Sequence, residues 1–155
     1  MKKRSMGIQK ALNKALECVV TCVYVGHLPF APGTYASALA CIAVYLVPSL
    51  FGDVFFVTGL VLFSVVCVGF FEYEGTDPGY IVIDEVAGMC VTMAAHRITL
   101  VNTIAGFLLF RFFDILKPFP IRQAERLKGA FGVVADDVVA GLFASIILVI
   151  LGRVL

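Results

Sequence analysis

The stretch IVIDEVAGMCVTMAA, residues 81–95, is an apolar run with two adjacent carboxylates, Asp84 and Glu85, near its start. A charge at bilayer depth costs roughly 2.5–3.5 kcal/mol, so it requires a partner, a cavity or a function. This stretch therefore predicts an apolar helix that carries a functional site at its beginning.

The composition of the whole chain indicates a membrane protein. Of its 155 residues 61% are hydrophobic, and its mean hydropathy is +1.00, whereas soluble domains are about 45–50% apolar. This length predicts a single domain over residues 1–155. The net charge of +1 says nothing about partners. The sequence has no stretch rich in lysine and arginine and no interleaving of aromatic with basic residues, so we expect no nucleic-acid partner. Nothing in the sequence indicates a protein partner.

Five apolar runs predict the fold. They cover residues 36–51, 54–71, 81–95, 100–116 and 137–155, with a long loop at 117–135. Each run has about the length of a membrane-embedded helix. We therefore predict an all-α fold, an integral membrane bundle of about four to five membrane-embedded helices. Residues 1–25 are predicted to form an additional amphipathic N-terminal helix in the membrane interface.

Pairing consecutive runs as hairpins places three polar loops, at 26–35, 72–85 and 111–137, on one face of the bundle. Most basic residues also belong to that face, and only Arg97 and Arg153 lie opposite. The members of the larger set are Lys2, Lys3, Arg4, Lys10, Lys14, Lys117, Arg122, Arg126 and Lys128. The positive-inside rule then predicts a protein of the cytoplasmic (inner) membrane with its site facing the cytoplasm.

The same face is predicted to collect five carboxylates: Asp84, Glu85, Asp114, Asp136 and Asp137. Acidic residues also favour the first turn of a helix, and we expect each adjacent pair to open a helix. Capping, however, would need only one residue at each place. Oxygen ligands fit Mg²⁺. Two histidines and five cysteines without a C-x-x-C pair make a zinc site a poor interpretation.

Arg111, Asp114 and Lys117 are spaced three residues apart and should share one helix face. One interpretation is a local ladder of ion pairs near the membrane interface. The other is a metal-binding carboxylate flanked by two bases that bind a phosphate, as phosphoryl transfer requires. The spacing alone is compatible with both.

Four ordered blocks resemble the phosphatidylglycerophosphatase A family. They are GHLPFAPGT at 26–34, DPGYIVIDEVAG at 77–88, FRFFDILKPFPI at 110–121 and GAFGVVADDVVAG at 129–141. The resemblance implies a Mg²⁺-dependent membrane phosphatase of glycerophospholipid biosynthesis. Its partners would be membrane lipids and phosphatidylglycerophosphate, whose terminal phosphate it would remove to give phosphatidylglycerol.

Carried over by position, the resemblance implies the following roles. The catalytic carboxylates would be Asp84, Glu85, Asp114, Asp136 and Asp137, and the metal ligands Asp84, Glu85, Asp114 and Asp137. The substrate would be bound by Arg111, Lys117 and Arg122, with Gly33 and Thr34 close by. Asp77 also falls in a family block, although an Asp-Pro-Gly turn explains it equally well.

Other classes of protein remain as alternatives. A small cation transporter or channel could use the carboxylates as ion ligands, but its ligands should lie near the membrane midplane rather than on one face. A non-catalytic membrane subunit has no need for paired acids. A phosphatidyltransferase also uses carboxylates and Mg²⁺, but its Asp-Gly and Ala-Arg pattern is missing. Within the phosphatase interpretation, attack by water and an aspartyl-phosphate intermediate both stay open.

Overall fold

The computed structural model describes residues 2–73 and 78–154, and within these ranges the chain forms helices and no strands. Asp77 lies outside the described residues. The helices are α1 (Lys2–Val20), the 3-10 helix η1 (Val25–His27), α2 (Pro32–Leu46), α3 (Pro48–Phe51), α4 (Val54–Phe70), α5 (Ile83–Met93), α6 (Leu100–Leu116), α7 (Ile121–Ala124) and α8 (Ala130–Val154). The predicted all-α fold is thus confirmed.

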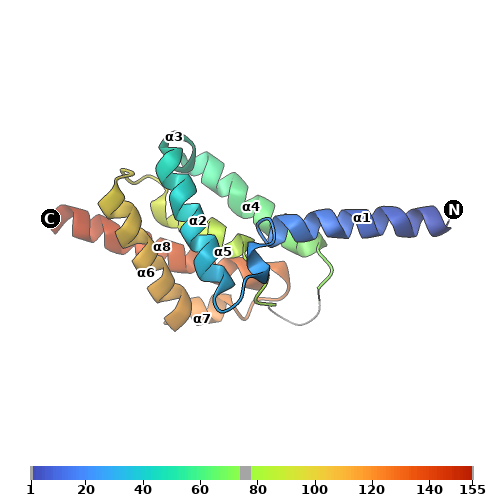
Figure 1. Ribbon diagram of the computed structural model, residues 1–155. Helices are drawn as coiled ribbons and strands as arrows, with labels where there is room; N and C mark the ends of the chain where they lie inside the picture. Colours follow the sequence, from blue (N-terminus) through green and yellow to red (C-terminus); the bar gives the residue numbers. More distant parts are fainter. Residues whose placement is uncertain (1, 74–77, 155) are drawn as a thin grey trace.

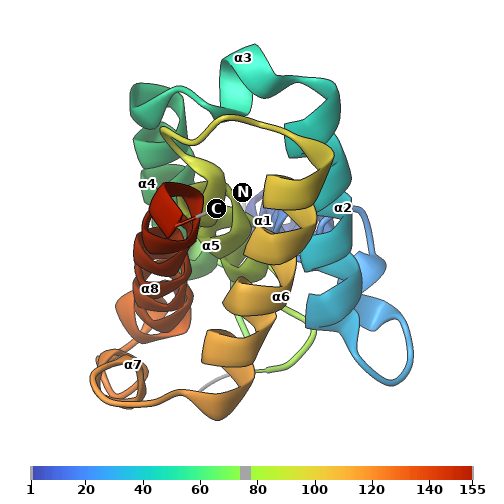
Figure 2. The same ribbon diagram turned by 90° about the vertical axis from the view of Figure 1, so that its left-hand side faces the viewer.

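Helix α5 lies at the centre of the bundle, and α2, α4, α6 and α8 surround it (Figure 2). Its residues Ala87, Met89, Cys90 and Met93 are fully buried. Met89, Cys90 and Met93 pack in a core with Phe110 of α6 and with residues of α2, α4 and α8. The neighbouring helices therefore shield α5 and position its N-terminal end, which carries Asp84 and Glu85.

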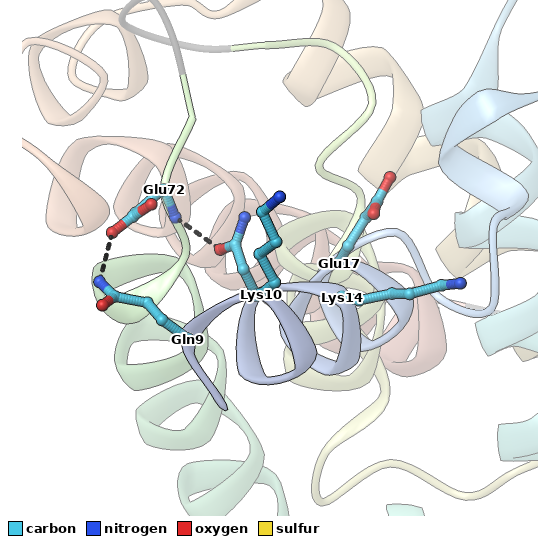
Figure 3. A pocket seen from close by; sticks show the side chains of 6 residues that line it. Gln9, Lys10, Lys14, Glu17 and Glu72 are labelled. Atoms are coloured by element: carbon cyan, nitrogen blue, oxygen red, sulfur yellow. Dashed lines mark hydrogen bonds between the residues drawn. The ribbon is translucent and has the colours of Figure 1, made fainter. Parts of the chain in front are cut away.

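Helix α1 projects away from the bundle (Figure 1). A hydrogen bond of 3.3 Å from Gln9 Nε2 to Glu72 Oε1 connects it with the segment after α4, and the backbone N–H of Glu72 donates to Asn13 Oδ1 at 3.2 Å. These residues line an open cavity of about 340 Å³ of mixed charge (Figure 3). We predicted a helix through residue 25, but α1 ends at Val20. The hydroxyl of Thr21 accepts from the backbone N–H of Tyr24 and stabilises the turn that follows.

The polar loops meet at one end of the bundle, as predicted. The backbone N–H of Val82 donates to the carbonyl of Val20 at 2.9 Å. A Cβ on Gly26 would overlap the carbonyl of Tyr80, so the first two loops are in contact. At the opposite end, the N–H of Ala95 donates to the carbonyl of Gly52, which brings the two short turns together.

Other predicted helix boundaries are also wrong. Helix α2 begins at Pro32 instead of residue 36, because proline fits the first turn of a helix, so the end of the predicted loop at 26–35 is helical. The last helix begins at Ala130 instead of residue 137, directly after Gly129 with a φ of 65°. Apart from Gly132, residues 130–135 are apolar and include no proline, so the helix continues through the segment that we took as loop. The run at 36–51 divides into α2 and α3 because Pro48 begins a new helix, and a residue before proline avoids helical geometry.

The outer surface of the bundle is strongly apolar. Large apolar side chains are exposed on α2, α4, α6 and α8, among them Leu46, Phe55, Leu62, Leu108, Phe112, Ile115, Ile146 and Ile150. Exposed apolar surface of this extent indicates contact with a membrane or another apolar partner. Among the described helices, α8 is long and apolar enough over Ala130–Gly152 to cross a membrane, while α2 and α4 are apolar but shorter.

Candidate active site

Three carboxylates converge where α5 and α8 meet. Asp84 and Glu85 lie in the first turn of α5, and Asp137 lies in the second turn of α8. One oxygen from each side chain lies within 4.8 Å of the others. Asp84 and Asp137 are buried, at 6% and 3% exposure. Three negative charges this close in a dry environment repel one another strongly, so the arrangement favours a bound cation.

The carboxylates meet because α5 and α8 cross at two glycines. A Cβ on Gly141 would overlap the carbonyl oxygen of Gly88, and a Cβ on Gly88 would lie 2.7 Å from the carbonyl oxygen of Asp137. Small residues at a helix crossing allow the backbones to approach closely. This crossing lies one turn from each part of the cluster, so it sets the distance between Asp137 and the carboxylates of α5.

Asp136 has a different role from its neighbour. Its carboxylate accepts a hydrogen bond of 2.6 Å from Lys117 Nζ, which also donates to Glu125 at 3.0 Å. Burial alone would lower the pKa of the Lys117 ammonium, but the hydrogen bonds and charges of Asp136 and Glu125 raise this pKa well above its usual range. Lys117 therefore stays protonated at every physiological pH and provides a fixed positive charge beside the cluster.

Arg111 connects α6 with α2. Its Nη1 donates to Asp114 at 2.5 Å and to the hydroxyl of the buried Ser37 at 3.4 Å. The carboxylate of Asp114 also interacts electrostatically with Glu85 and Asp137. Asp114 therefore lies beside the group of three carboxylates, and Arg111 holds it there.

Three buried polar atoms of this region make no hydrogen bond to any described residue: Glu85 Oε2, Arg111 Nε and Asp136 Oδ1. Buried polar atoms in native proteins almost always have a partner, so such atoms need an explanation. Two unpaired acceptor oxygens and one unpaired N–H around a carboxylate cluster fit a site that binds a cation together with an anionic group.

Gly33, in the first turn of α2, leaves room for the carboxylate of Glu85. A Cβ at this position would overlap Glu85 Oε1. Gly33 also accepts, through its carbonyl, a hydrogen bond of 2.7 Å from Ser37 Oγ. The glycine thus belongs to the wall of the site.

We expect Gly33→Ala to displace the Glu85 carboxylate and to lower kcat by about 10–100-fold, the usual range when a residue that positions a functional carboxylate is disturbed. Unfolding temperature should change little, because a flexible side chain moves rather than the backbone. Phosphate release and thermal unfolding of the same preparation test this. As a control, Gly59→Ala adds a methyl group that meets nothing within 4 Å. Equal activity of both variants would contradict this role of Gly33.

The structure brings together most of the predicted site residues. Asp84, Glu85 and Asp137 form the cluster, and Asp114 lies beside it, although it is outside the group that could share one ion. Thr34 is half-buried in the first turn of α2, next to Gly33. Arg122 is exposed in α7 and does not belong to the cluster.

The sequence interpretation of Asp136 and Asp137 as the opening residues of a helix is wrong, because they lie in the second turn of α8. Sequence reasoning also missed Ser37, Glu125 and the glycine pair of Gly88 and Gly141. The repeated glycine in the blocks at 77–88 and 129–141 was the available signal for the helix crossing. No comparable signal indicates Ser37 or Glu125.

Comparisons with known proteins identify the family of this chain. The family model described as Phosphatidylglycerophosphatase A matches residues 18–152. Proteins named phosphatidylglycerophosphatase A from Haemophilus influenzae and Escherichia coli are 38% and 35% identical to the chain. The first match covers 76% of each protein, and the second covers 83% of this chain and 78% of the relative.

A protein of Bacteroides thetaiotaomicron named "Putative phosphatidylinositol-3-phosphatase" is 35% identical over 81% of this chain and 86% of its own length. No solved structure matches the chain. The three relatives are all named as phosphatases that act on the phosphate of a lipid.

Proposed function

Since this chain belongs to the phosphatidylglycerophosphatase A family and is a phosphatase, we propose that it hydrolyses the terminal phosphomonoester of phosphatidylglycerophosphate. The products are phosphatidylglycerol and inorganic phosphate, which places the reaction in glycerophospholipid biosynthesis. The observation that supports this most is the convergence of Asp84, Glu85 and Asp137 beside an arginine with an unpaired, buried N–H.

We further propose Mg²⁺ as the cofactor. The donors in the cluster are carboxylate oxygens, which suit Mg²⁺, and Glu85 Oε2 is a buried acceptor without a partner. Asp84, Glu85 and Asp137 would hold the ion, with Asp114 at its edge. When bound, Mg²⁺ neutralises phosphate charge and lowers the pKa of a bound water.

The residues of the chain supply the remaining parts of the reaction. Arg111 Nε points at no acceptor and can donate to a phosphate oxygen. Lys117 is held beside Asp136 and contributes positive charge where negative charge develops during phosphoryl transfer. Asp136 Oδ1 is a free acceptor that can take a proton from an attacking water. The packed helices exclude bulk water and strengthen each of these interactions.

The proposed location is the inner membrane, with α2, α4, α5, α6 and α8 embedded and the site facing the cytoplasm. The apolar outer faces of the helices support embedding. At the site end lie the basic side chains of Lys10, Lys14, Lys117, Arg122, Arg126 and Lys128, while Arg97 lies at the other end among the described side chains. This asymmetry supports the orientation through the positive-inside rule.

The purified protein in detergent is expected to release phosphate from phosphatidylglycerophosphate with Mg²⁺ and not with EDTA. Phosphatidylinositol-3-phosphate serves as the second substrate, because one relative is named for that lipid. Mg²⁺ should also raise the unfolding temperature, since an ion that binds only the folded state stabilises it, by about 2.7 kcal/mol at a concentration 100 times the Kd.

If phosphatidylinositol-3-phosphate were hydrolysed faster than phosphatidylglycerophosphate, it would replace phosphatidylglycerophosphate as the proposed substrate. Ion flux in liposomes without any phosphate release would instead support the transporter alternative. Hydrolysis that persists in EDTA, together with an unfolding temperature that Mg²⁺ does not change, would overturn the metal proposal.

A further inference from the structure

An open cavity of about 430 Å³ lies between the end of α6 and α7. Three basic side chains line it, from Lys117, Arg122 and Arg126, and none of the described residues that line it is acidic. Its other walls are apolar or neutral: Leu116, Pro118, Phe119 and Gln123. A cavity with this lining attracts an anionic group.

Arg122 and Arg126 differ from Arg111, the arginine beside the carboxylate cluster. Arg111 is bound to Asp114, whereas neither Arg122 nor Arg126 makes a side-chain hydrogen bond or ion pair to a residue that the structure describes. Both are exposed. Their guanidinium groups are therefore available for a ligand, and a guanidinium suits the two oxygens of a phosphate group.

Lys117 connects this cavity with the carboxylate cluster. Its side chain lines the cavity, and its Nζ lies 2.6 Å from Asp136 Oδ2. The carboxylate of Asp136 in turn interacts electrostatically with Asp114 and with Asp137, which belongs to the cluster. An anion bound by the two arginines would thus lie adjacent to a second phosphate at the carboxylates.

The rim of the cavity continues into the apolar surface of the bundle. Leu116 and Phe119 are 60% and 75% exposed. On α6, Phe112 and Ile115 extend the same exposed apolar surface. A ligand that combines a phosphate with acyl chains matches this combination of basic cavity and apolar rim.

We propose that Arg122 and Arg126 bind the phosphodiester of a lipid whose terminal phosphomonoester lies at the carboxylate cluster. This inference rests on the proposed function and explains how the site would select its lipid. Phosphatidylglycerophosphate carries both phosphates, joined by a short glycerol link, whereas phosphatidic acid carries only the phosphomonoester. The arginines therefore favour lipids with two phosphates over phosphatidic acid.

The test compares the two lipids with the double variant Arg122→Gln/Arg126→Gln in mixed micelles. For phosphatidylglycerophosphate we expect KM to rise about tenfold or more, because charge-assisted hydrogen bonds are lost, with little change in kcat. For phosphatidic acid, kcat/KM should stay the same. Lys128→Gln is the matched control: it removes a positive charge from the same loop, but Lys128 does not line the cavity.

An equal loss of activity toward both lipids, or no loss toward either, would overturn the proposal. Binding of micelles that carry each lipid, measured in EDTA to prevent turnover, separates this inference from the proposed function. Suppose that the wild-type protein released no phosphate but bound phosphatidylglycerophosphate more tightly than phosphatidic acid, and that the double variant lost this preference. The cavity assignment would then stand, and the proposed reaction would fail. If active wild-type protein bound both lipids equally, the proposed reaction would stand and the cavity assignment would fail.

Discussion

Asp137→Asn is expected to lower kcat for phosphatidylglycerophosphate hydrolysis by about 10²–10³-fold, the loss typical for removal of one electrostatic contact to the reacting groups. Asp137 is the contribution of α8 to the carboxylate cluster, and it is 3% exposed. An amide offers one oxygen instead of a charged carboxylate, so the proposed ion would lose its link to the second helix.

The same variant should not be less stable in EDTA than the wild-type protein. Asp137 lies close to Asp84 and Glu85, and removing one of three neighbouring negative charges relieves repulsion in a buried place. The stabilisation by Mg²⁺ should disappear. Thermal unfolding with and without Mg²⁺ measures both effects on the preparation used for phosphate release.

Asp53→Asn provides the matched control. Asp53 caps α4 by accepting from the N–H of Phe56 at 2.8 Å, and it lies at the end of the bundle opposite the site. Asparagine caps helices about as well as aspartate, so this variant undergoes the same chemical change without a functional cost. If Asp137→Asn kept wild-type activity, or if it still gained stability from Mg²⁺, the carboxylate cluster would not be the reaction centre.

Gly141→Ala is expected to have the largest effect on the fold. The new methyl group would overlap the backbone carbonyl of Gly88 and lie 3.2 Å from the Cβ of Val91, so α5 and α8 must move apart. Overpacking of this kind costs typically about 1–3 kcal/mol. This overpacking cost exceeds the gain of about 1 kcal/mol that replacing glycine by alanine brings to a helix. Activity should fall as well, because the separation of the helices also separates Asp137 from Asp84 and Glu85.

Gly152→Ala is the control in the same helix, because a methyl group there meets nothing within 4 Å. It should be neutral or stabilising. Thermal unfolding in detergent and phosphate release are measured for both variants. A Gly141→Ala protein with wild-type stability and activity would show that close contact at the helix crossing is not required.

The sequence predicted the all-α fold and the common end of the polar loops because apolar runs and polar loops alternate in it. It could not distinguish the roles of Asp136 and Asp137. Neighbouring residues of a helix point about 100° apart, so one faces Lys117 and the other faces α5. This difference depends on where α8 begins, and we took residues 130–135 as loop although they include no proline.

The partners of the two bases were equally hidden. The spacing of Arg111, Asp114 and Lys117 indicated one helix face and left an ion-pair ladder or a phosphate site open. The structure pairs Arg111 with Asp114 within α6 but gives Lys117 a partner on α8, 19 residues away. Such long-range contacts depend on how the helices pack, and the spacing within one helix does not contain that information. The assignments to metal and substrate remain predictions.

The shortness of the central helix has a consequence for the kinetics. Helix α5 has 11 residues and rises only about 16 Å, roughly half of the hydrocarbon thickness of a bilayer. In the proposed embedding, its carboxylate end and the loops around it lie at one surface of the bundle, where lipid phosphates are found. A substrate can reach that surface by lateral diffusion while its acyl chains remain among their neighbours. Turnover should then follow the mole fraction of substrate in the membrane plane rather than its bulk concentration.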